Sequence, residues 1–212
     1  MRKMITVKIN GEERQYPQGA TYEDVANDYQ QEYENLIALA ARDGKIRELF
    51  KKLTRDCEVT FFTLKDDVGN KTYVRSATML FLKAVFDVYG REAAQSCRVE
   101  FAIGNGSYIS PKGKINATEE NAAKIRNRMR ELVEAKTPFL KRSYSLDNAM
   151  ELFRKEGMKD KEKLFRYRRG SFVNIYEMDG YYDYYYGYML PNAGYVKWFD
   201  VIAYEDGFML LL

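Results

Sequence analysis

The stretch ITVKINGEERQY, residues 5–16, predicts how the fold begins, with a β-hairpin. Every second residue from position 5 to position 9 is apolar, which is the pattern of a strand with one buried face. Asn10-Gly11 is a favoured two-residue turn between antiparallel strands, because both residue types tolerate a positive φ. Tyr16 then lies on the return strand.

A helix and two further strands are expected after the hairpin. Thr21 and Asp24 have the spacing of a capping box, so we expect a helix to begin there. Apolar runs at residues 36–40 and 58–63 predict strands. A hairpin, a helix and further strands in this order are typical of a ubiquitin-like β-grasp module. We therefore assign residues 1–65 to a β-grasp domain.

The second predicted domain covers residues 66–212, and the polar, turn-forming residues 66–70 mark the boundary before it. Its helices are expected over residues 75–89, after a cap at Thr118, and over residues 146–155 with an end at Gly157; its strands are expected at residues 97–103 and 171–176. The predicted fold class is α+β, with a mainly antiparallel sheet in this domain.

The composition excludes several classes of function. The chain has 212 residues with 34 basic and 31 acidic side chains, a formal net charge of +3 that is far from a strongly basic RNA binder. It contains no histidine, which excludes Ser-His-Asp and Cys-His catalysis and histidine metal sites within it. Cys57 and Cys97 are expected to be small buried side chains in a reducing cytoplasm. No apolar run reaches the ~18 residues that span a bilayer, so we expect a cytoplasmic protein with no membrane partner.

Tyrosines are concentrated towards the end of the chain. Ten of the 18 lie between Tyr167 and Tyr204. The favoured interpretation is a sheet with one buried and one partly exposed tyrosine face, because tyrosine favours strands. The alternative is an aromatic platform for bases or for a partner protein. The apolar residues 207–212 are interpreted as a strand or linker that continues into a missing part.

No motif based on spacing alone indicates an enzyme. The glycine-rich residues 104–114 do not fit the spacing of a phosphate-binding loop. The carboxylate pairs at residues 66–67 and 119–120 lie in loops or at the start of helices. Carboxylates in such places cap helices or face solvent, so these pairs do not indicate acid–base catalysis. We therefore expect no catalytic residue in this chain.

Four segments resemble, in the same order, parts of the editing domain of threonyl-tRNA synthetases, and the module before them resembles the TGS domain of those enzymes. The segments are YVRSATML at residues 73–80, AIGNGSY at 102–108, SLDNAMELFRKEG at 145–157 and DYYYGYMLPN at 183–192. Together they extend the resemblance over nearly the whole chain.

The editing site itself departs from the family. Two histidines, a cysteine and a third histidine form that site in the family, and the aligned residues are Arg75, Met79, Tyr185 and Met189. An arginine cannot act as a base near neutral pH, and a thioether is a poor ligand for a hard metal ion. The resemblance therefore implies a degenerate editing-site pocket that holds no metal. We favour closure of this pocket by packing, with Arg75 turned outward, over binding of a flat, partly anionic ligand.

The end of the chain also resembles the N-terminal region of bacterial uridine or nucleoside kinases of the phosphoribulokinase/uridine kinase type. The matching residues are 184–188, Pro191, 194–195, 199–200 and 204–208. This resemblance implies a non-catalytic regulatory or ligand-recognition region ahead of a kinase domain that follows residue 212. The partner would be that kinase domain, with contacts between copies in a homo-oligomer as a further option. ATP and magnesium would serve only the missing kinase, and this chain would hold no cofactor.

Two other functions remain open at this point. One is a degenerate threonyl-tRNA synthetase-like module that binds tRNA or another RNA without editing it; the other is an interaction module without a small ligand. If RNA is bound, it is weakly bound, and the densest basic run supplies the phosphate contacts: Lys159, Lys161, Lys163, Arg166, Arg168 and Arg169.

Overall fold

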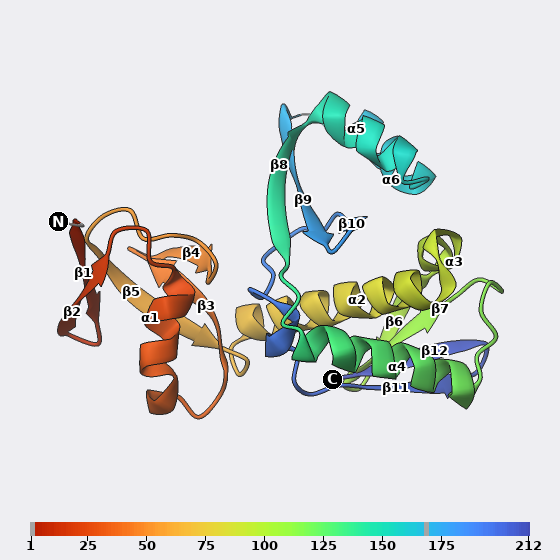
Figure 1. Ribbon diagram of the computed structural model, residues 1–212, viewed down its shortest axis with the longest axis horizontal. Coiled ribbons are helices and arrows are strands. Elements are labelled where there is room, and N and C mark those ends of the chain that lie inside the picture. Colours follow the sequence, from red (N-terminus) through yellow and green to blue (C-terminus); the bar gives the residue numbers. More distant parts are fainter. Residues whose placement is uncertain (1–2, 168–169) are drawn as a thin grey trace. The chain divides into compact units, whose positions relative to one another are not determined.

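The computed structural model describes residues 3–167 and 170–212 and divides into two compact units. The first unit contains the described residues up to Ser76 together with Gly187–Pro191, and the second contains Ala77–Tyr186 and Asn192–Leu212. Helix α2 (Asp67–Tyr89) contributes residues to both units. Figure 1 labels the elements along the chain.

A five-stranded sheet forms the first unit, in the order β2-β1-β5-β3-β4. Its strands are β1 (Met4–Ile9), β2 (Glu12–Pro17), β3 (Ile37–Arg42), β4 (Lys45–Glu48) and β5 (Cys57–Thr63). The predicted hairpin is confirmed, because Ile9 pairs with Glu12 and leaves Asn10-Gly11 as the turn, with φ of 51° and 88°. β1 and β5 run parallel, and the other neighbouring strands of this sheet run antiparallel.

The helix of this unit begins at the predicted capping box. The Asp24 main-chain N–H donates to Thr21 Oγ1 at 3.1 Å, and the Thr21 N–H donates to Asp24 Oδ2 at 2.7 Å. Helix α1 (Tyr22–Tyr29) buries Tyr22, Val25, Ala26 and Tyr29, and a short 3₁₀ turn, η1 (Gln30–Glu32), follows it. Two cap hydrogen bonds therefore fix the start of a helix whose apolar side is buried.

Most of residues 66–70, which are turn-forming by composition, are helical in the structure. Helix α2 already begins at Asp67, while Asp66 accepts a hydrogen bond from the Thr63 N–H at 2.7 Å. Gly69 lies so close to the preceding strand that a Cβ atom there would be 2.0 Å from the Thr63 carbonyl oxygen. This close contact between α2 and the Thr63 main chain explains why a glycine stands at position 69, although the position is helical. The division of the chain into domains at residues 65 and 66 stays a prediction.

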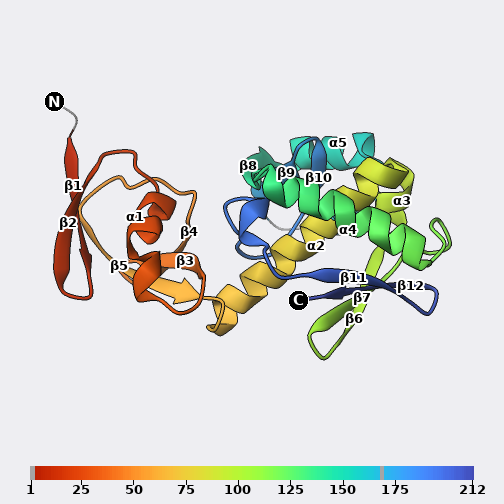
Figure 2. The same cartoon turned by 60° about the horizontal axis from the view of Figure 1, so that its bottom comes forward.

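The second unit contains a four-stranded antiparallel sheet in the order β11-β12-β7-β6. Its strands are β6 (Arg98–Ile103), β7 (Gly106–Ser110), β11 (Asp200–Tyr204) and β12 (Gly207–Leu211). Helices α2 and α4 (Glu119–Glu134) lie over one face of this sheet (Figure 2). The Phe81 ring of α2 lies 6.2 Å from the Phe208 ring of β12, and both side chains are fully buried.

A three-stranded antiparallel sheet, β10-β9-β8, forms the rest of this unit. The remaining elements are α3 (Arg91–Ser96), β8 (Leu140–Ser145), α5 (Leu146–Lys155), α6 (Lys159–Arg166), β9 (Phe172–Met178), β10 (Tyr181–Asp183) and the 3₁₀ turn η2 (Ala193–Tyr195). Phe153 of α5 and Phe165 of α6 stack at 5.1 Å in one buried cluster with Val173 and Ile175 of β9. Gly157, with a φ of 74°, follows α5 as predicted.

The fold-class prediction is confirmed: the chain is α+β with mainly antiparallel sheets. Within residues 3–167 and 170–212, no helix is long and apolar enough to cross a membrane.

Candidate functional site

Arg75, the first of the four positions aligned with an editing site, contacts main chain within the first unit. Its Nη1 atom donates to the Tyr188 carbonyl oxygen at 3.5 Å. Its guanidinium also lies against Gly187, where a Cβ atom would be 2.6 Å from the Arg75 Cζ atom. Gly187 has a φ of 132°, a conformation that side chains rarely permit. The expectation that Arg75 turns outward is therefore wrong.

Met189 belongs to the same unit and is completely buried. Its main-chain N–H donates to Glu48 Oε1 at 3.3 Å. The next N–H, of Leu190, donates to Ser76 Oγ at 2.9 Å, and that hydroxyl donates to the Thr72 carbonyl oxygen at 2.8 Å. These bonds attach the Gly187–Pro191 segment to β4 and α2 of the first unit.

Met79 and Tyr185 lie in the second unit. Met79 is completely buried on α2. The Tyr185 hydroxyl is buried without a hydrogen-bond partner among the described residues, and burial raises the pKa of this tyrosine well above its ordinary value. Tyr185 and Met189 do not lie on a strand, because β10 ends at Asp183 and the chain is irregular beyond it. That the four residues line one degenerate pocket stays a prediction.

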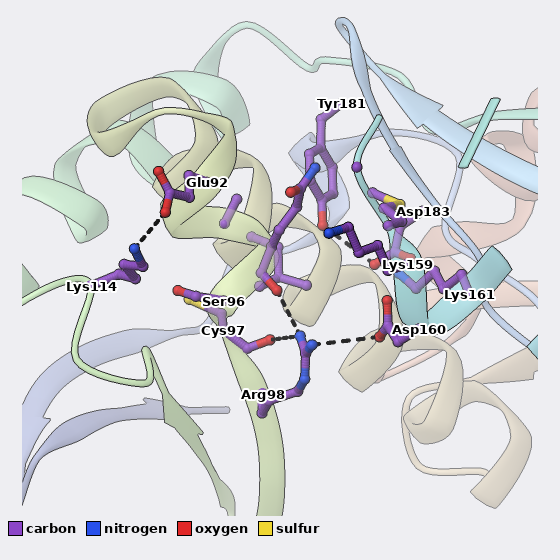
Figure 3. Close-up of a pocket in the computed structure, with 15 residues that line it drawn as sticks. Glu92, Ser96, Cys97, Arg98, Lys114, Lys159, Asp160, Lys161, Tyr181 and Asp183 are labelled. Carbon is purple, nitrogen blue, oxygen red and sulfur yellow. Dashed lines mark hydrogen bonds and ion pairs between the residues drawn. The ribbon is translucent and has the colours of Figure 1, made fainter. Parts of the chain in front are cut away.

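A cavity of about 300 Å³ lies elsewhere in the second unit, between α2, α3, β6, α6 and β10 (Figure 3). Its lining combines polar and charged side chains with the apolar residues Leu82, Ala94 and Met158. The charged residues that line it are Glu92, Arg98, Lys114, Lys159, Asp160, Lys161 and Asp183. This cavity is the candidate functional site.

Most of the charges around the cavity are paired. Lys114 forms an ion pair with Glu92, Lys161 forms one with Asp183, and Arg98 lies 3.7 Å from Asp160. Arg98 also donates to the carbonyl oxygens of Gln95 and Cys97, at 2.7 and 3.0 Å. Lys159 makes no ion pair with any residue that the structure describes, so it is the cation available to a ligand.

The Lys161–Asp183 pair is the most enclosed of these. Asp183 is 4% exposed, and besides Lys161 it accepts hydrogen bonds from the Tyr184 N–H at 2.6 Å and from the Tyr181 hydroxyl at 3.3 Å. The Lys161 side chain is 23% exposed. Burial lowers the pKa of its ammonium to about 8; Asp160 opposes this shift and Arg98 adds to it. Burial raises the pKa of Tyr181, which stays protonated.

Gln95 contributes an unsatisfied donor to the same cavity. Its Nε2 atom is buried and has no hydrogen-bond partner in the described part of the chain. Gly157 allows this side chain its position, because a Cβ atom at Gly157 would lie 3.0 Å from Gln95 Oε1. A buried amide donor without a partner is costly, so an acceptor brought by a ligand or by water would satisfy it.

The predicted phosphate contacts divide into two groups on α6. Lys159, Lys163 and Arg166 are exposed, and their spacing of four and three residues places them on one helix face. Lys161 instead pairs with Asp183 in the cavity. Arg168 and Arg169 lie outside the described residues.

Sequence reasoning found no cavity here, because its residues come from distant segments. Gln95 and Arg98 carried no motif, Asp183 carried only its place at the start of an editing-like segment, and only the fold brings the three together. Among the described residues, no group of three or more Cys, Asp or Glu side chains is placed to hold a metal ion. The absence of bound zinc stays a prediction.

No protein-family model matches this chain. It is similar to threonine–tRNA ligases: 28% identical over 97% of its length to that of Thermotoga neapolitana, and 28% identical over 96% to that of Thermotoga maritima. It is 25% identical over 89% of its length to that of Porphyromonas gingivalis. The chain spans about 31% of the length of the Thermotoga relatives, and 29% of the third. These relatives favour the tRNA-binding alternative over the kinase prediction.

Proposed function

We propose that this chain is a threonyl-tRNA synthetase-like module, with TGS-like and editing-like parts, that binds tRNA without hydrolysing an aminoacyl ester. The observation that carries the proposal is the similarity to threonine–tRNA ligases along nearly the whole chain. The proposal excludes editing, because the side chains at the four aligned positions include neither a histidine nor a cysteine.

The contacts of these side chains support a role without chemistry. Arg75 is held by the main chain at Gly187 and Tyr188, and Met189 is buried beside Glu48 and Ser76. The raised pKa of Tyr185 keeps its phenol protonated near neutral pH. None of these groups can activate water as a general base at that pH. We therefore expect a bound aminoacyl-tRNA to keep its ester.

The exposed face of α6 supports RNA binding. Lys159, Lys163 and Arg166 lie on this face, and the Tyr167 side chain that follows is 85% exposed. Cations spaced along one face suit phosphates, and an exposed aromatic ring suits a base. With a net charge of +3, the affinity is expected to be modest and to fall steeply with salt.

A binding titration with a charge-matched control tests the proposal. Fluorescence anisotropy would follow a labelled tRNA specific for threonine at several salt concentrations. Replacing Lys159, Lys163 and Arg166 by Glu is expected to weaken binding at least tenfold. The control replaces Lys8, Lys45 and Lys52, three exposed lysines of the first unit, by Glu, and is expected to weaken binding by less than about threefold.

Three outcomes contradict the proposal. Equal losses for both triple variants would show binding through net charge alone. No detectable binding at low salt would remove tRNA as a partner. Release of an amino acid from a misacylated tRNA faster than in buffer would show that an editing activity remains.

A kinase parent is a separate prediction, which rests on the resemblance of residues 184–208 alone. The reading frame after residue 212 tests it, because a phosphate-binding loop there would identify the parent.

A further inference from the structure

The cavity beside α6 is lined by residues that, apart from Lys159, are not among the proposed RNA contacts. We propose that Lys161 is a nucleophile that accepts an acyl group from a small acyl phosphate bound in this cavity. Lys159 is shared with the proposed RNA contacts, whereas Lys161, Asp183, Gln95 and Arg98 line the cavity and are not among those contacts.

The nucleophile is held in place by a fixed carboxylate. Lys161 Nζ contacts Asp183 Oδ1, and Asp183 is in turn fixed by the Tyr184 N–H and the Tyr181 hydroxyl. Lys161 and Asp183 both line the cavity, so a molecule inside it reaches the amine. Burial and the neighbouring Arg98 cation favour the neutral amine, which is the nucleophilic form of lysine, and the Asp183 carboxylate can accept its proton.

The surroundings of the amine suit an anionic acyl donor. Lys159, without an ion pair among the described residues, and Arg98, which faces Asp160 at 3.7 Å, can receive a phosphate group. The buried Gln95 Nε2 donor has no partner and can bind the acyl carbonyl oxygen. A volume of about 300 Å³ is at the lower end for ligand sites and limits the donor to a small molecule.

The reaction is a simple acyl transfer. The neutral Lys161 amine attacks the carbonyl carbon, a C–N bond forms, and the bond between that carbon and the phosphate oxygen breaks. Inorganic phosphate leaves with the electron pair of the broken bond. Asp183 accepts the proton that the nitrogen loses and passes it to solvent. The products are an amide at Lys161 and free phosphate, so no oxidant or other co-reactant is required.

The protonation state of Lys161 makes this reaction accessible near neutral pH. Its lowered pKa of about 8 leaves a substantial neutral fraction at pH 8. The groups that face it are Asp183 and Tyr181 on β10, Asp160 on its own helix and Arg98 on β6.

The test uses acetyl phosphate and the full chain at pH 8, with the acetylation rate of each lysine measured by mass spectrometry. Lys161 is expected to react at least tenfold faster than Lys163, an exposed lysine of the same helix. Its rate is expected to saturate with acetyl phosphate and to fall when inorganic phosphate is added. Lys161→Arg is expected to abolish the fast site and leave the rate at Lys163 unchanged.

Two further arms separate binding from reactivity. Arg98→Gln is expected to lower the rate with acetyl phosphate more than the rate with p-nitrophenyl acetate, a neutral donor. Asp183→Asn, checked for folding by circular dichroism, is expected to slow Lys161 with both donors. A rate at Lys161 no higher than at Lys163 would overturn the proposal. A fast rate that neither saturates nor responds to phosphate would also overturn it, by showing an amine that reacts without a donor site.

Discussion

The guanidinium of Arg75 occupies the space in which a side chain at Gly187 would begin, 2.6 Å from the position of the missing Cβ atom. The two residues are separated by more than a hundred positions in sequence but belong to one compact unit. The glycine is required both by this contact and by its φ of 132°. The Arg75 side chain is therefore part of the packing of this unit.

Gly187→Ala is expected to lower the free energy of unfolding by about 1–3 kcal/mol, because the new methyl group meets Arg75 and the backbone conformation is strained. In an Arg75→Ala background the loss is expected to be smaller, since only the strain remains. Urea unfolding of the two single variants and the double variant measures this coupling. Gly170→Ala is the control, because a Cβ atom added there would have no described residue within 4 Å apart from its chain neighbours. Equal losses in both backgrounds would contradict the contact.

Met79→Ala is expected to lower the free energy of unfolding by about 2–5 kcal/mol, because the side chain is completely buried and its removal leaves a cavity. Met4→Ala is the matched control, since Met4 is 46% exposed and is expected to change stability by less than about 1 kcal/mol. Chemical unfolding compares the two. A loss at Met79 no larger than at Met4 would show that the position is not packed.

Two lysine–aspartate pairs on α2 are expected to differ sharply in strength. Lys83 is 3% exposed and contacts Asp87 at 2.7 Å and Asp179 at 3.2 Å, whereas Lys71 is 60% exposed in its pair with Asp67. Lys83→Met is expected to lower the free energy of unfolding by about 1–3 kcal/mol, because the Asp87 carboxylate, which is 17% exposed, and the Asp179 carbonyl oxygen lose a hydrogen-bond donor. Lys71→Met is expected to change it by at most about 1 kcal/mol. Similar effects in urea unfolding would contradict the burial of Lys83.

Stability is expected to fall at alkaline pH through Cys97. Burial raises the pKa of this thiol from 9.0 to about 12. Above pH 9 the unfolded chain releases a proton that the folded chain keeps, so rising pH favours unfolding by up to about 1.4 kcal/mol per pH unit. Buried tyrosines act in the same direction, and the comparison is therefore with Cys97→Ala. Urea unfolding at pH 8 and pH 10 is expected to show a smaller loss in the variant. An identical loss would contradict the burial of the thiol.

Local signals predicted the elements that depend on local physics. The turn at Asn10-Gly11, the caps at Thr21 and Thr118 and the end of a helix before Gly157 are all present in the structure. Each depends on a few neighbouring residues whose preferences agree with the fold. The start of α2 was not predicted, because glycine disfavours a helix when it is judged from local sequence alone. The close contact between Gly69 and Thr63, which explains the glycine, is visible only in the structure.

The candidate site was largely beyond sequence reasoning. Lys161 and Asp183 are 22 residues apart, and their contact depends on how α6 packs beside the strand β10. Lys161 appeared in the sequence only as one cation of a basic run. Nothing in the sequence marked Gln95, because whether a side-chain donor is buried without a hydrogen-bond partner depends on the residues that the fold places around it. The tyrosine-rich residues after Asp183 were predicted as a strand from propensity, but they pair with no neighbouring strand.

The short turn between β9 and β10 decides which chemical group reaches the cavity. Asp179 and Gly180 form a two-residue turn with positive φ, and it pairs Tyr181 with Met178 and Asp183 with Tyr176. Alternation along β10 then places Tyr181 and Asp183 in the cavity wall and leaves Tyr182 out of it. One inserted residue would reverse this alternation and exchange an acid for a phenol. A change in the length of this turn would therefore change which side chain faces the cavity. Homologues with a turn of another length are expected to bind different ligands there.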